Sequence, residues 1–146
     1  MDSIFEKKIA QRFINRIDIL TSNSTGNWGE MSVSQMLAHC SAAFEDNSSG
    51  PNLITRLILR SFVRKIVIGN RPYKKNMKTA EAFVVTDDRD FNEEKMRLIR
   101  SIEKIQELGT KYFENRKHPV FGNITIKEWN IFFSKHLNHH LKQFGV

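Results

Sequence analysis

The sequence has one cysteine, Cys40, and a single cysteine excludes a disulfide bond within the chain. No apolar run approaches the ~20 residues that a membrane-spanning helix needs. The first residues also lack the apolar segment of a secretory signal. There is no glycine-rich phosphate loop, H-E-x-x-H motif or serine elbow to form a competing catalytic set. These absences predict a protein of the reducing cytoplasm without a transmembrane segment.

Acidic residues are missing between Asn47 and Ala80, although the whole chain has sixteen. The eight basic residues of this window are Arg56, Arg60, Arg64, Lys65, Arg71, Lys74, Lys75 and Lys78. The window therefore carries +8 of a net charge of +7, and the rest of the chain sums to −1. Three interpretations of this basic segment 56–78 stay open. The segment could be an ordinary solvated surface. Its positive charge could attract an anionic substrate or thiol cofactor toward the site. It could also bind nucleic acid or an anionic membrane.

Apolar residues at helical spacing predict an all-α protein with one domain, residues 1–146. The expected helices cover residues 4–20, the stretch from Ser32 to the loop at 45–51, the stretch from Asp90 to about Gly109, and residues 125–144. An extra basic helix over residues 53–68 and an extended connection over 70–89 lie between the second and third of these. An antiparallel four-helix bundle is the economical architecture. Capping boxes are expected at the helix starts, and the pairs are Ser3 with Glu6, Ser32 with Gln35, and Thr125 with Glu128.

The last predicted helix carries histidines in the middle of its apolar face. With Trp129 as the reference at about 100° per residue, His136 and His140 fall about 20° to either side of it, and His139 falls about 80° away. Buried imidazoles need polar partners. Residues i and i+4 are neighbours on a helix, so one metal ion could bind both. Two core histidines bonded to carbonyls or carboxylates are the alternative.

His39 supplies a third ligand if the second and fourth predicted helices face one another, although it lies on the flank of its apolar stripe. Three neutral imidazoles leave at least one coordination position open for water or substrate. Such a set suits a divalent ion, with Zn²⁺, Ni²⁺ or Fe²⁺ favoured. An open position offers Lewis acidity and a lowered pKa for a bound water or thiol.

Several segments carry a family resemblance: MSVSQMLAHC at 31–40, RPYKKNMKTAEAF at 71–83, DF at 90–91 and the closing HPVFGNITIKEWNIFFSKHLNHHLKQFGV. Together they resemble the DinB-like superfamily of four-helix-bundle metalloenzymes, and most closely a branch catalogued as a domain of unknown function. The resemblance implies three metal-binding histidines, which map onto His39, His136 and His140. Characterised members of the superfamily include metal-dependent transferases that use bacillithiol or mycothiol and a thiol-dependent maleylpyruvate isomerase. In these the metal is thought to activate a cofactor thiol as thiolate, which is sound chemistry for a coordinated thiol.

Other polar residues near the expected site have weaker roles. His139 could donate to a ligand and orient it, and Gln143 could line the site; otherwise they lie at the bundle edge and at the fraying C-terminus. Cys40 falls on the apolar stripe, which favours packing over nucleophilic chemistry. The favoured function is therefore a metal-dependent transferase or hydrolase that activates a low-molecular-weight thiol or water against a small electrophile.

The alternative function is a non-catalytic protein that binds an anionic partner through the basic segment 56–78. A small-molecule substrate is favoured over nucleic acid as the partner, and a homodimer through an apolar helix face stays open.

Overall fold

The computed structural model describes residues 2–45, 52–78 and 84–146, and it is mostly helical. Its helices are α1 (Lys7–Ile19), α2 (Val33–Phe44), α3 (Leu53–Phe62), α4 (Arg64–Val67), α5 (Phe91–Glu114) and α6 (Ile126–Gln143). A hairpin of two short antiparallel strands, β1 (Lys117–His118) and β2 (Gly122–Asn123), precedes α6. The sequence predicted only a loop there. Residues 46–51 of the predicted loop and 79–83 of the predicted connection lie outside the described residues.

Local capping explains where most helices begin. The predicted capping boxes at Ser32 and Thr125 are both present, with Gln35 and Glu128 as their partners. The Asp90 side chain likewise accepts from the backbone nitrogen of Glu93 at the start of α5. The box predicted at Ser3 is wrong. Glu6 occupies the cap position of α1 without a side-chain cap, and its backbone nitrogen bonds the Ser3 carbonyl in a turn.

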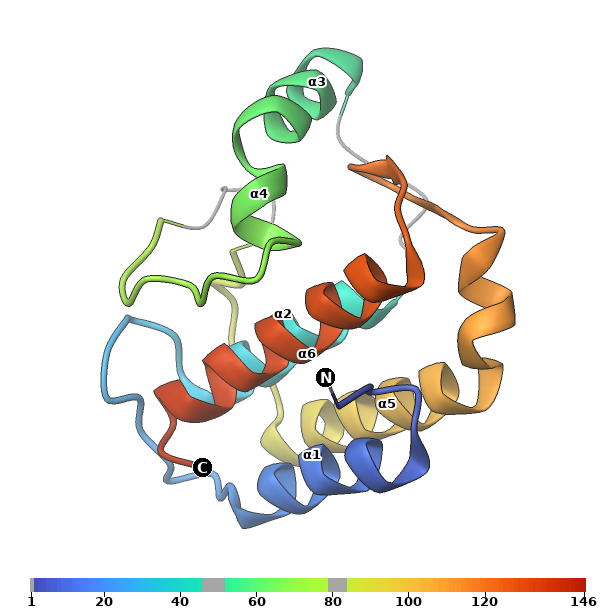
Figure 1. Ribbon diagram of the computed structural model, residues 1–146. Coiled ribbons are helices and arrows are strands. Elements are labelled where there is room, and N and C mark those ends of the chain that lie inside the picture. The colour runs from blue at the N-terminus through green and yellow to red at the C-terminus, as the bar shows by residue number, and fades with distance from the viewer. Residues whose placement is uncertain (1, 46–51, 79–83) are drawn as a thin grey trace.

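Helices α1, α2, α5 and α6 lie alongside one another, α4 contacts α6, and α3 stands apart from the four (Figure 1). Each of the four contributes apolar side chains to a common core. The fully buried ones include Ile17, Met36, Leu37, Leu98, Ile102, Phe133, Leu137 and Leu141. The N-terminal segment is tied to α6, because the Asn130 side chain accepts from the Ile4 nitrogen at 2.9 Å. This packing brings α2 against α6, and the histidines of the two helices face each other there.

Two helix breaks modify the predicted lengths. The helix predicted over 53–68 divides at Val63 into α3 and α4. Gly109 interrupts α5 with a φ of 66°, a value that favours glycine, and the helix resumes through Phe113, which is buried. No helix in the described part of the chain combines the length and apolar content needed to cross a membrane.

Candidate metal centre

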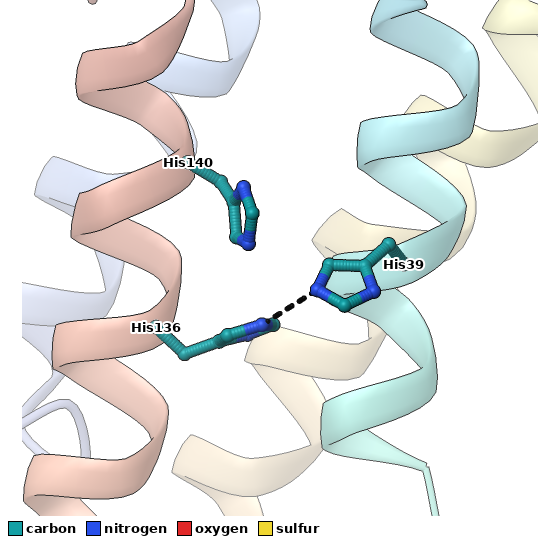
Figure 2. Close-up of side chains that lie close together, drawn as sticks. All are labelled: His39, His136 and His140. Atoms are coloured by element: carbon teal, nitrogen blue, oxygen red, sulfur yellow. Dashed lines mark hydrogen bonds between the residues drawn. The ribbon is translucent and has the colours of Figure 1, made fainter. Parts of the chain in front are cut away.

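Three imidazoles converge between α2 and α6. His39 projects from α2 toward His136 and His140, which lie one turn apart on α6 (Figure 2). The three ring centroids are each 4.8 Å from the other two. One potential ligand atom from each histidine lies within 4.8 Å of the other two. The packing of the helices thus brings together the three residues that the sequence singled out, including His39 from its flanking position.

The spacing of the nitrogens suits a shared cation. The Nε2 atoms of His136 and His39 are 2.9 Å apart. Two imidazole nitrogens bound to one ion at about 2.1 Å, with an angle of 90–110° between the bonds, lie roughly 2.9–3.4 Å apart. Without a cation, one of the two nitrogens must carry a proton for the contact to be favourable, because a neutral imidazole has one donor and one acceptor.

A hydrogen-bond chain sets the tautomer of His140. The Gln143 amide nitrogen donates to the Trp28 carbonyl at 2.7 Å, which leaves the amide oxygen facing His140. That oxygen lies 2.9 Å from His140 Nδ1 and can only accept, so Nδ1 carries the proton. The lone pair of His140 is therefore on Nε2. Such a contact fixes a metal-binding imidazole in its orientation and makes it a better ligand.

Burial keeps the α6 imidazoles neutral. Burial, together with a smaller effect of the neighbouring His39, lowers the pKa of His140 to about 3. Burial also holds the pKa of His136 well below its ordinary value, with contributions from the surrounding histidines. The neutral form is the one that binds metals. The buried Nδ1 of His136 has no hydrogen-bond partner among the described residues.

A wall of aromatic rings stands beside the three histidines. The ring of His139 lies 5.1 Å from that of His140, 5.4 Å from Tyr73 and 5.8 Å from Trp28. Tyr73 also approaches the His136 ring at 6.5 Å. The Lys75 ammonium sits over the Trp28 ring at 4.7 Å. Sequence reasoning assigned no site role to Trp28 or Tyr73, because both lie in irregular segments without periodicity.

Lys135 anchors part of this wall to α6. Its ammonium donates to the carbonyls of Ile66, Gly69 and Arg71, and it lies over the Tyr73 ring at 4.6 Å. Burial lowers the pKa of Lys135 to about 8. The contacts hold the chain around Tyr73 against the helix that carries two of the three histidines.

The remaining candidates do not join the three histidines. Cys40 is fully buried, with its sulfur against that of Met36, and burial raises the pKa of its thiol. It is thus a packing residue, as its position on the stripe predicted. His118 is also buried, but its Nδ1 accepts from the backbone nitrogens of Val120 and Phe121. Only His39, His136 and His140 form a group suited to one metal ion among the described residues.

The chain matches the model of a family described as "Protein of unknown function (DUF1569)" over residues 6–145, and it belongs to that family. No curated protein matches the chain. No solved structure matches it either.

Proposed function

We propose that this protein is a metal-dependent enzyme whose one divalent ion is held by His39, His136 and His140. The observation that supports the proposal is the convergence of three imidazoles at 4.8 Å between ring centroids. The three rings point toward one another, as the ligands of one shared cation do. We further propose that α1, α2, α5 and α6 form a DinB-like four-helix bundle in a single domain, since they share one core and the sequence resembles that superfamily.

Three nitrogen ligands favour Zn²⁺, Ni²⁺ or Fe²⁺ and leave coordination positions open. When bound, such an ion supplies Lewis acidity and lowers the pKa of a thiol or water at an open position. The chain's own residues orient the imidazole ligands. Gln143 holds His140 with its Nε2 lone pair inward.

The reaction class that fits is transfer of a low-molecular-weight thiol, or of water, to a small electrophile. Cys40 is too deeply buried to serve as the nucleophile, so the attacking group must come from solution. An exposed cation beside the site, Lys75, would favour an anionic thiol or substrate over a cationic one.

Metal content tests the proposal directly. The protein would be purified without a histidine tag, supplied with Zn²⁺ or Ni²⁺, and measured by plasma mass spectrometry. We expect about one equivalent in the wild type and a loss of most of it in His39→Ala, His136→Ala and His140→Ala. The matched control is His118→Asn, which removes a buried histidine elsewhere and should keep the metal. A wild type that binds no metal contradicts the proposal.

Proton release separates a thiol from water as the activated group. Because thiolate rather than thiol binds a metal, adding a low-molecular-weight thiol to the metal-loaded protein at pH 6, below the pKa of about 7 of a metal-bound water, should release close to one proton per site. The His136→Ala protein should release none. Metal-dependent turnover of an electrophile without any thiol, and no proton release when thiol is added, would instead assign a hydrolase.

A further inference from the structure

Helix α3 exposes an unusually apolar face. At about 100° per residue, its large apolar residues other than Leu59 fall within roughly half of the helix circumference. Their exposed fractions are 66% for Leu53, 72% for Ile54, 52% for Leu57, 53% for Ile58 and 76% for Phe62. Single exposed apolar residues are ordinary, but a contiguous face of this kind marks a contact surface. No residue of α3 is buried.

Arginines hold this apolar face outward. Arg60, about 110° around α3 from the centre of this face, donates to the Val120 carbonyl at 2.7 Å. Arg64 at the start of α4 donates to the Phe121 carbonyl and pairs with Glu128 at 2.9 Å. The polar side of the helix is therefore attached to the hairpin and α6, and the apolar side is directed away from them. Figure 1 shows α3 as the part of the molecule farthest from the packed helices.

The sequence window that contains α3 carries charge of one sign. The window from Asn47 to Ala80 contains no acidic residue. Its exposed cations are Lys65, Arg71, Lys74, Lys75 and Lys78, and none of these forms an ion pair with a carboxylate within the described ranges. A second copy of this face would bring two windows of +8 together, which disfavours self-association. Nucleic acid would match the charge but would leave the apolar face exposed to water.

We propose that α3 docks this protein on an anionic membrane surface. An amphipathic helix with Leu, Ile and Phe on one face and basic residues around it lies in the interface plane, with its apolar face at the headgroup boundary. Phe62, Ile54 and Leu57 would enter that boundary, while the exposed Lys65, three residues after Phe62, meets the headgroups. The helix would lie on the membrane without crossing it. The proposal does not depend on the metal centre.

Vesicle flotation tests this docking. The full chain would be mixed with vesicles of equal parts phosphatidylglycerol and phosphatidylcholine, and separately with phosphatidylcholine vesicles. We expect the partition constant to be at least about tenfold higher on the anionic vesicles, and to fall as NaCl rises from 0.1 to 0.5 M. Phe62→Ser should lower the partition constant about tenfold or more, because one large apolar side chain no longer leaves water.

Ile19→Ser is the matched control, since Ile19 is 66% exposed but lies at the end of α1. It should bind vesicles like the wild type. The proposal is overturned if the wild type does not float with anionic vesicles or if Phe62→Ser floats equally well. It is also overturned by a dimer in light scattering that Phe62→Ser dissociates without any vesicle binding. Salt-sensitive DNA binding that Phe62→Ser preserves, again without vesicle binding, would assign the segment to nucleic acid.

Discussion

His118 and His140 are buried to the same degree, with 7% of each residue exposed, yet their surroundings use their nitrogens differently. His118 is enclosed by the rings of Phe121, Trp129 and Phe132, at 4.8, 5.2 and 4.7 Å. Its Nδ1 accepts two backbone hydrogen bonds of 3.1 and 3.2 Å, so its lone pair is already occupied. His140 instead donates from Nδ1 to Gln143, and its lone pair remains on the nitrogen that faces the other imidazoles.

The two histidines show that burial and a shifted pKa do not identify a ligand. Burial lowers the pKa of His118 to about 4, with a smaller effect of Arg64, and it lowers that of His140 to about 3. Strongly shifted pKa values such as these two are typical of functional sites. The difference lies in the direction of the Nε2 or Nδ1 lone pair, which faces two other imidazoles in His140 and backbone donors in His118. Each of the following experiments tests that difference.

Removing a ligand should have the largest effect. A metal that binds only the folded protein stabilises it by about 4 kcal/mol when free metal exceeds Kd a thousandfold. We expect the wild type and His118→Asn to gain this stability in urea unfolding with Zn²⁺. His136→Ala should gain less than about 1 kcal/mol, since two imidazoles remain. Equal gains in all three proteins would show that the three histidines do not hold the metal.

The His118 hairpin should respond to acid. The pKa of the His118 imidazole is about 4 in the folded protein, below the ordinary value of 6.5, so His118 of the unfolded chain takes up the proton first as pH falls. Stability from this group is complete above pH 6.5 and is lost between pH 6.5 and 4, by roughly 3 kcal/mol. Asparagine at 118 keeps a side-chain acceptor for the turn without titrating. In metal-free protein, the loss of stability between these pH values should be smaller in His118→Asn by roughly this amount. Identical pH profiles would contradict the prediction.

Loss of the Gln143 amide should weaken the site without abolishing it. In Gln143→Leu, His140 Nδ1 loses its acceptor, and contacts of this type change metal affinity by about 10–100-fold. Affinity would be measured by competition with a chromogenic chelator. Gln11→Leu on the exposed face of α1 is the matched substitution and should leave affinity unchanged. An unaltered affinity in Gln143→Leu would mean that this contact does not orient His140.

Substitution of two glycines tests the position of the Gln143 amide, and its expected effect on metal affinity is the smallest. Gly29 has a φ of 79°, and a Cβ there would lie 2.5 Å from the Gln143 amide nitrogen. Gly145 has the same φ, but its nearest neighbour to a Cβ would be Asn27 at 3.6 Å. Both alanine variants carry similar backbone strain. Only Gly29→Ala should lower metal affinity, by roughly three- to tenfold, because the flexible amide can shift partly aside. Equal affinities in the two variants would contradict this.

Local sequence patterns predicted much of the helical structure. Side chains at Ser32, Asp90 and Thr125 bond backbone groups three residues away, so the start of each helix depends on neighbouring residues alone. The Ser3 box failed because its partner Glu6 is itself the cap residue. The short hairpin before α6 was missed, since two-residue strands have no periodicity to detect.

Helical periodicity by itself determined that His136 and His140 share one face of α6, because residues four apart lie one turn apart. Only the tertiary structure decided that His39 meets them, since its stripe position was marginal and the contact spans 97 residues of chain. The protonated nitrogen of His140 was likewise decided through Gln143 by the Trp28 carbonyl, 115 residues away. Periodicity follows from the geometry of one helix, whereas the direction of a lone pair depends on which distant groups the packed core brings within hydrogen-bond distance.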